Sequence, residues 1–310
     1  MEHIINNMTI AASLSCYRDF FWKAMRGSDA AYADMGEAKY NNTGTFMLPA
    51  KTASKYAAAL KRYNLFRQRG TVLTETARDS KIYISNNDAR PEWVPENEPI
   101  PTTEDNSFPP KDVSAHKLAI VTALQQDFVS DIGFDLESYL IGRFSKAFGK
   151  AEEDAFINGT GVSMPRGILH DTDGAETGVT VTGDITVDDV LALYFSVDRQ
   201  YRSDGAWLMN DETALKLKTL KDADGQYLWN QNSDTILGKP VLISEFMPSE
   251  GKPIAFGDFS YYYIVDRLPL TVRTLHQLFA MQQKVGFLGV ELLDGLLIRP
   301  EAVKVLRVSE

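Results

Sequence analysis

An acidic, proline-rich segment, residues 86–111, constrains the fold of this chain most strongly. It reads "NNDARPEWVPENEPIPTTEDNSFPPK" and holds six of the thirteen prolines. Proline interrupts helices and removes a backbone donor from sheets, so the segment predicts an extended excursion with little internal structure. Loops of this length within compact domains are usually functional or disordered.

The segments on both sides of this excursion are typical of strands. Apolar and polar residues alternate in residues 71–85 and again in residues 116–130, which is the period of a half-buried strand. We therefore predict a long hairpin with a proline-stiffened tip. Such a hairpin cannot bury a core of its own and needs a neighbouring surface to lie on.

The strongest helical pattern covers residues 135–158. Asp135 is a suitable N-cap, and Glu137 falls in the positively polarised first turn. We predict that the helix ends near Asn158 with Gly159 as a left-handed C-terminal cap. Apolar residues recur every three or four positions along one face: Leu136, Leu140, Phe144, Ala147, Ala151 and Ala155.

The stretch "EEDAFINGTGVSMPRGI", residues 152–168, combines acids with glycines at the end of this helix. A phosphate-binding loop needs a preceding strand and a following Lys-Ser/Thr, and both are missing here. Three consecutive acids point in different directions on a helix, so we predict a solvated or subunit-facing surface with weak ion pairs, in which Lys150 reaches Glu153 or Asp154.

The glycines and proline that follow predict a structural corner. Proline restricts the backbone, and Gly167 permits a positive φ at the chain reversal. The residues of this predicted corner are Gly159, Gly161, Pro165 and Gly167.

The rest of the chain indicates a mixed α+β fold. Residues 1–27 predict an amphipathic helix without the basic start of a secretory signal, and apolar residues on it follow helical spacing. Residues 27–50 are typical of a loose arm or linker, and residues 54–70 predict a helix that ends at Gly70. Helices and strands then alternate to the end. The apolar positions of the first helix are Leu14, Tyr17, Phe21 and Met25.

Composition and motifs argue against several functions. The net charge of -10 gives no general attraction to nucleic acid. The single cysteine, Cys16, cannot form an intrachain disulfide, and no apolar run is long enough for a transmembrane helix. The four histidines lack metal-ligand spacing, and "DADGQ" at 222–226 reads as a tight turn rather than a calcium loop. We expect no cofactor, no metal and no catalytic site.

Five segments, in order, resemble the major capsid protein of tailed bacteriophages, the Hong Kong 97 phage family. They are "YRDFFWKAMRG" with "TGTFMLPA", then "AFGKAEEDAFINGTGVSMPRGIL", then "YRSDGAWLMNDETALKLKTLKDADGQYLWN" with "ILGKPVLISEFMP", then "IAFGDFSYYYIVDR", and last "VGFLGVELLDGLLIRPEAVKVL". The third segment carries an axial-domain motif whose positions here are Trp207, Asn210, Asp222, Gly225, Gly238 and Pro240.

The resemblance implies a capsid fold made of an arm, an extended loop, a peripheral domain and an axial domain. The implied boundaries are 1–44 for the arm with a short pre-segment, 45–75 for the start of the peripheral domain, 76–111 for the extended loop, 112–180 for the peripheral domain with its spine helix at 135–158, 181–265 for the axial domain, 266–294 for peripheral strands, and 295–310 for a strand that returns to the axial domain.

The resemblance also implies a function. Copies of the chain would form pentamers, hexamers and an icosahedral shell around double-stranded DNA, without sequence-specific DNA binding or a membrane. Scaffold, portal and maturation protease would be partners, with assembly in the host bacterial cytoplasm and a final place in the virion. The loop would contact the adjacent subunit with Trp93 as its anchor. The expected contact residues are Trp93, Pro95, Glu96, Glu98 and Pro99.

Two alternatives remain at this stage. An encapsulin-like shell around a cargo enzyme would use the same fold. An enzyme with a mobile lid formed by residues 86–111 would belong to another class, and the absence of any catalytic constellation argues against it.

Overall fold

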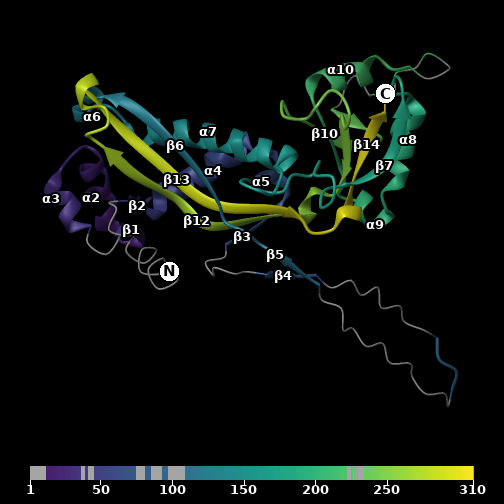
Figure 1. Ribbon diagram of the computed structural model, residues 1–310, viewed down its shortest axis with the longest axis horizontal. Helices are drawn as coiled ribbons and strands as arrows, with labels where there is room; N and C mark the ends of the chain where they lie inside the picture. Colours follow the sequence, from purple (N-terminus) through teal and green to yellow (C-terminus); the bar gives the residue numbers. More distant parts are fainter. Residues whose placement is uncertain are drawn as a thin grey trace.

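The computed structural model describes residues 12–35, 39–40, 45–74, 81–84, 93–96, 109–221, 225, 227, 229 and 234–309. The body is elongated, with one six-stranded sheet at each end (Figure 1). A long helix, α7, runs behind the first sheet towards the second.

The first sheet contains the two longest strands of the described chain, which pair antiparallel with each other. Its order is β1-β2-β12-β13-β6, and β3 adds to β12 in parallel. Its members are β1 (Lys39–Tyr40), β2 (Thr45–Met47), β3 (Thr71–Thr74), β6 (His116–Gln125), β12 (Tyr262–Leu275) and β13 (Lys284–Leu297).

The second sheet has the order β7-β14-β11-β8-β10-β9 and mixes parallel with antiparallel pairs. Its strands are β7 (Glu176–Thr182), β8 (Ala206–Met209), β9 (Thr235–Ile236), β10 (Lys239–Ile243), β11 (Ile254–Gly257) and β14 (Val303–Ser309). The helices around it are α8 (Val187–Ser196), α9 (Arg199–Arg202) and α10 (Asp211–Thr219).

Helix α7 covers Leu136–Asn158, as its apolar spacing predicts. Asp135 caps it by accepting a hydrogen bond from the backbone N–H of Ser138 at 3.0 Å. The predicted left-handed cap at Gly159 is wrong, because this residue is extended with φ -62°. The chain leaves the helix as a strand-like segment that folds straight back on it.

The N-terminal region contains more regular structure than a linker. Helix α2 (Ser15–Met25) buries Tyr17, Phe21 and Met25 as predicted, whereas Leu14 precedes it and is exposed. Within the predicted linker, β2 pairs with β12, so this part of the arm belongs to the first sheet. The further short helices are α3 (Asp29–Asp34), α4 (Ala50–Leu60), α5 (Leu65–Arg69) and α6 (Gln126–Ser130), with 3-10 turns η3 (Lys61–Tyr63), η4 (Phe259–Tyr261), η5 (Ala280–Gln282) and η6 (Pro300–Ala302).

The base of the proline-rich excursion is a two-stranded antiparallel ribbon. It pairs β4 (Lys81–Tyr83) with β5 (Pro110–Asp112). The prediction that residues 71–85 and 116–130 pair with each other is therefore wrong. The long strand β6 instead pairs with β13, because its apolar side chains Leu118, Ile120 and Leu124 pack into the core of the first sheet.

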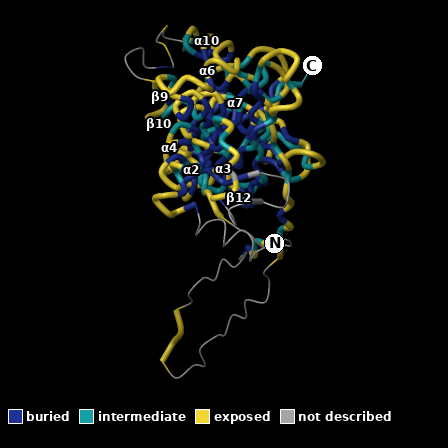
Figure 2. The backbone as a smooth tube through the Cα atoms, turned by 90° about the vertical axis from the view of Figure 1, so that its left-hand side faces the viewer, coloured by how far each residue is buried: buried dark blue, intermediate teal, exposed yellow. Residues whose placement is uncertain are grey.

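Apolar side chains form three main cores, and the buried residues run through the middle of the body (Figure 2). One core lies beneath the first sheet around Phe144 and Phe148 of α7, and another lies within the second sheet around Trp207. The third core joins them through Phe156 and Tyr262. This arrangement makes α7 and β12 the shared elements of both ends.

We predict opposite effects for two glycines of α7. Gly142 is exposed, and a Cβ added there would meet no atom within 4 Å, whereas a Cβ at Gly149 would lie 2.8 Å from Cβ of Tyr63. Gly142→Ala should raise the free energy of unfolding by about 0.5–1 kcal/mol because alanine favours helix. Gly149→Ala should lower it by about 1–3 kcal/mol through overpacking. Denaturant titrations of both variants measure the change in free energy of unfolding. Equal changes for Gly142→Ala and Gly149→Ala would contradict the packing of η3 on α7.

Candidate functional site

The joint between the two ends of the body is centred on Arg67. Asn64 interrupts the helix predicted over residues 54–70, because its backbone is extended with φ -142°. Its side-chain oxygen then accepts hydrogen bonds from the N–H groups of Phe66 (2.9 Å) and Arg67 (3.1 Å), which starts α5 afresh. This new helix start gives Arg67 its position beside α7 and β12.

The guanidinium of Arg67 bridges two carboxylates on different elements. Its Nε and Nη2 donate to the two carboxylate oxygens of Glu152 on α7, each at 2.6 Å. Its Nη1 and Nη2 donate to Asp266 on β12 at 2.9 and 2.8 Å. Burial alone would lower the pKa of Arg67, but the two carboxylates raise it well above its ordinary value. Bidentate pairs of this kind fix geometry on both sides at once.

The predicted solvated surface at Glu152 and Glu153 is wrong. Glu152 and Glu153 are only 1% and 6% exposed. They are buried because α5 covers one side of this helical turn and the end of β10 covers the other. Glu153 accepts hydrogen bonds from the Leu65 N–H (2.8 Å) and the Ser244 hydroxyl (2.6 Å). Burial raises the pKa of Glu153.

The two neighbouring charged residues of this turn behave differently. Asp154 is exposed and accepts a hydrogen bond from the Asn158 amide at 2.9 Å. Lys150 pairs with Glu245 at 2.5 Å, and not with Glu153 or Asp154 as predicted. Since Glu245 follows β10, this contact also connects α7 to the second sheet.

Glu291 on β13 lies next to this cluster and carries a raised pKa. The residue is 4% exposed, and the Tyr56 hydroxyl donates to its Oε2 at 3.1 Å. Burial, followed by the nearby charge of Glu152, raises the pKa of Glu291 well above its ordinary value. The raised pKa favours the neutral form of Glu291, which avoids a third negative charge beside Glu152 and Asp266.

The residues predicted to form a corner after α7 lie together in the structure. Thr160 and Arg166 form an isolated bridge, and the Gly167 N–H donates to the Gly159 carbonyl at 2.9 Å. Gly161 has φ +74°, while Gly167 does not adopt the positive φ that we predicted. A side chain at Gly167 would instead collide with the Ile157 carbonyl, so close approach is the reason for glycine there. Pro165 is buried beneath this turn.

The corner is also fixed to the first sheet. The Tyr262 hydroxyl on β12 donates to the Arg166 carbonyl at 2.8 Å, and the Arg166 N–H donates to the Gly295 carbonyl on β13 at 3.0 Å. The end of α7 is thus held by both long strands.

The predicted axial-motif residues fall in the second sheet and its turns. Trp207 on β8 is fully buried and donates from Nε1 to the Ile236 carbonyl at 3.0 Å. Asn210 caps α10 by accepting from the Thr213 N–H at 2.7 Å. Pro240 lies on β10 opposite Thr235. Gly225 and Gly238 have φ +78° and +74° in turns, and Asp222 lies outside the described residues.

The tip of the proline-rich excursion is exposed where the structure describes it. Trp93 has 102% relative exposure, and Pro95 and Glu96 are also exposed. Glu98 and Pro99 lie outside the described residues. An indole in water contributes nothing to the stability of this subunit, so its apolar surface is available to another molecule.

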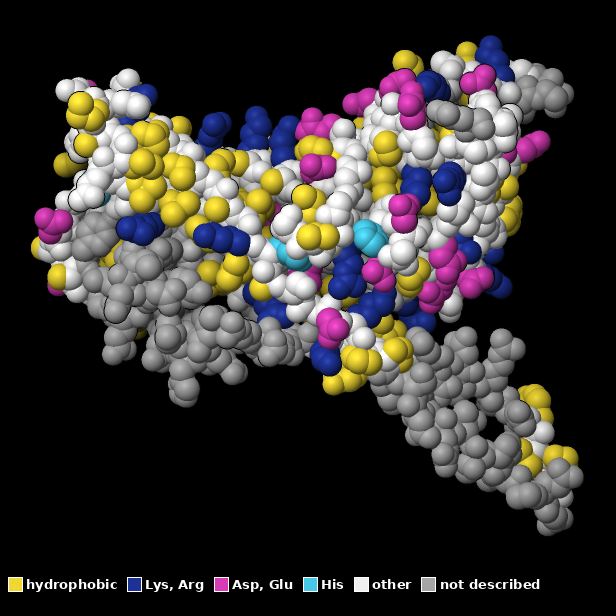
Figure 3. Space-filling view, in the orientation of Figure 1, with side chains coloured by type: hydrophobic (Ala, Val, Ile, Leu, Met, Phe, Trp, Pro, Cys, Tyr) yellow, Lys and Arg dark blue, Asp and Glu magenta, His cyan; other side chains and the backbone are white. Residues whose placement is uncertain are grey.

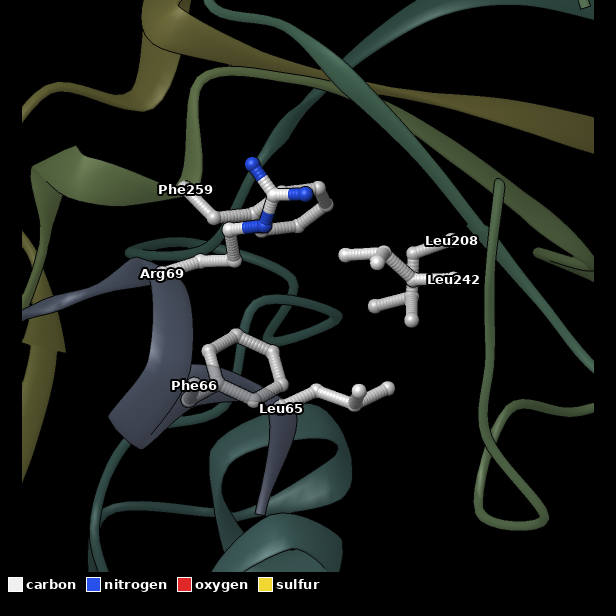
Figure 4. Close-up of a pocket in the computed structure, with 6 residues that line it drawn as sticks. All are labelled: Leu65, Phe66, Arg69, Leu208, Leu242 and Phe259. Carbon is white, nitrogen blue, oxygen red and sulfur yellow. The ribbon is translucent and has the colours of Figure 1, made fainter. Parts of the chain in front are cut away.

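Several pockets lie among the described residues, and one of about 370 Å³ borders the Arg67 cluster, where Arg67, Asp266 and Glu291 line it. The pocket in Figure 4 lies between α5 and the second sheet and is lined by Leu65, Phe66, Arg69, Leu208, Leu242 and Phe259. Its volume of about 10 Å³ is the space of one water molecule at most. In the same described part of the chain, no group of His, Cys, Asp and Glu is arranged to hold a metal ion. No described helix is long and apolar enough to cross a membrane.

Comparison with known families is decisive. The model of the phage capsid family matches residues 44–308. The chain belongs to the phage capsid family. This membership identifies it as a major capsid shell protein with a structural role and a place in the virion, and it does not favour the encapsulin-like alternative.

Solved capsid structures agree with this assignment. The capsid of an empty GTA particle is 28% identical with a TM-score of 0.68, covering 92% of this chain and 99% of that chain. The capsid of a native GTA particle is 26% identical with a TM-score of 0.65, covering 92% and 100%. A structure from Microbacterium phage Oxtober96 shares the fold at 17% identity and a TM-score of 0.60, covering 79% and 91%. Comparison with curated proteins gave no match.

The capsid protein offers a test of the raised pKa of Glu291. A folded-state pKa above the unfolded value means that the stabilisation is complete at low pH and is lost as pH rises through the folded pKa. Glu291→Gln keeps the neutral shape but cannot ionise. We expect it to match the parent in free energy of unfolding near pH 5 and to exceed it increasingly towards pH 9, in urea titrations at both pH values.

Glu250→Gln is the matched control, because Glu250 is exposed. The difference in free energy of unfolding between Glu250→Gln and the parent should not change with pH. A Glu291→Gln variant that loses stability relative to the parent as pH rises would show that Glu291 is ionised in the folded protein.

Proposed function

We propose that copies of this capsid protein assemble through pentamers and hexamers into an icosahedral shell around double-stranded DNA. The observation that carries the proposal is the match of the phage capsid family to residues 44–308. The fold supports it, because a body joined by a buried ion cluster can present the same surfaces in every copy.

Within such a shell, the proline-rich excursion contacts the adjacent subunit. The described tip exposes Trp93 and Val94 together, which leaves apolar surface unused in the single chain. Aromatic anchors of this type often carry much of the binding energy at interfaces. The contact set we propose is the one predicted from the sequence: Trp93, Pro95, Glu96, Glu98 and Pro99.

The relation to DNA is enclosure without sequence-specific binding. A net charge of -10 per copy opposes adhesion to the phosphate backbone. Many copies with this charge would keep packaged DNA free to enter and leave. A scaffold, a portal and a maturation protease are the further partners that we propose, with assembly in the host bacterial cytoplasm and no enzymatic activity in this chain. The division into arm, extended loop, peripheral and axial domains stays part of this proposal.

Negative-stain electron microscopy with size-exclusion chromatography of the purified chain tests the assembly. We expect closed shells or capsomer rings from the parent. Trp93→Ala should raise the protein concentration needed for assembly by at least tenfold, because the loss of an interface anchor costs about 2 kcal/mol or more.

Phe195→Ala is the matched control, since Phe195 is 66% exposed on α8, away from the excursion. It should assemble like the parent. A parent chain that stays monomeric with its expected scaffold present would contradict the shell, and an unchanged Trp93→Ala variant would contradict only the role of the tip.

A further inference from the structure

The outer edge of the first sheet is formed by β6, and this edge is unusually regular. β6 pairs with β13 over ten consecutive residues without a register shift. In the described part of the chain, no strand and no backbone hydrogen bond occupies its other side. Every second N–H and C=O of β6 along that side therefore needs a partner from outside the subunit or water.

Free strand edges of this kind are templates for another strand, so monomeric proteins usually interrupt them with proline, bulges or inward-pointing charges. β6 contains no proline and no bulge, and its only lysine or arginine is Lys117. The edges of the second sheet differ: β7 has a register shift against β14, and β9 is two residues long. Among the edge strands of the two described six-stranded sheets, only β6 is both long and paired without a register shift.

The sheet face beside this edge is apolar as well as exposed. Ala119, Val121 and Ala123 point away from the core, and Val121 is 43% exposed. Their cross-strand neighbours on β13 include Leu288 and Val290. Figure 3 shows hydrophobic side chains gathered over the part of the body where β6 and β13 run. Because Leu118, Ile120 and Leu124 pack into the core, the strand cannot slip by one residue.

We propose that β6 pairs antiparallel with β6 of a second copy of this chain, across a two-fold axis at Val121. The inference rests on the proposed shell, because it names one contact between the copies that build it. The two sheets would then continue into one twelve-stranded sheet through an isologous contact.

The sequence of β6 is self-complementary about Val121. Residues that share a face meet across the axis, with Leu118 opposite Leu124 and Ala119 opposite Ala123. Lys117 meets Gln125, so no like charges face each other. A second copy therefore pairs with the free backbone edge, places the apolar side chains of the two strands side by side and brings no like charges together. A charged or proline-rich partner strand would lack one of these properties.

Site-specific disulfide formation tests this register. In a Cys16→Ser background, which removes the exposed native thiol, Val121→Cys places two thiols face to face on the axis. Mild oxidation of assembled particles should convert most chains into dimers on a non-reducing denaturing gel. Ala119→Cys is the matched control, because its two copies would lie ~14 Å apart along the strands, beyond the reach of a disulfide.

The combination of Ala119→Cys with Ala123→Cys should restore the dimer, because these positions face each other in the same register. Particles that form, seen by electron microscopy, with no more dimer from Val121→Cys than from Ala119→Cys would overturn the strand pairing and leave the shell function intact. If the unaltered chain with its scaffold forms no particles, the proposed function fails and this contact fails with it.

Discussion

The bridge from Arg67 to Glu152 and Asp266 is the interaction on which the rest of the structure depends. It joins α5, α7 and β12 within a buried site, where the two carboxylates would be costly without their shared cation. Such a cluster adds little net stability compared with apolar packing, but it tolerates only one geometry. Its value to this protein lies in fixing how α5 and α7 lie against β12 of the first sheet.

The remaining features follow from that fixed joint. The corner after α7 returns the chain to the long strands through the Tyr262 hydroxyl, and Glu153 reaches the second sheet through Ser244. A shell subunit needs this rigidity because each copy must present its contact surfaces in nearly the same relation. The surfaces proposed for contact, the excursion tip at Trp93 and the free edge of β6, lie on parts of the body that the joint does not use.

Local patterns predicted the elements whose residues interact with near neighbours. The spacing in residues 135–158 predicted α7, and the spacing in residues 1–27 predicted the buried Tyr17, Phe21 and Met25 of α2. The ordered resemblance of five segments predicted the family, which the family match confirms. The mixed helix and sheet fold followed from the same segments and is confirmed by the solved capsids.

The sequence patterns did not predict which distant segments of the chain contact each other. The burial of Glu152 depends on contacts with α5 and with Asn64 before it, more than eighty residues earlier in the chain. Asn64, a residue that favours helix starts, is the one sequence feature that could have indicated the break before α5. β12 continues through Pro269, because Pro269 falls between the stretch that pairs with β3 and the stretch that pairs with β2, where no partner needs its missing N–H. Likewise, nothing within residues 116–125 identifies β13 as their partner.

The most direct test of this account is the free energy of unfolding of Arg67→Met, measured by denaturant titration near pH 7. Removal of the cation leaves Glu152 and Asp266 without their partner, so the account predicts a loss of about 3–5 kcal/mol. Arg62→Met, at an exposed position in η3, should change it by less than about 0.5 kcal/mol. An Arg67→Met variant as stable as Arg62→Met would contradict the claim that this cluster fixes α5 and α7 against β12.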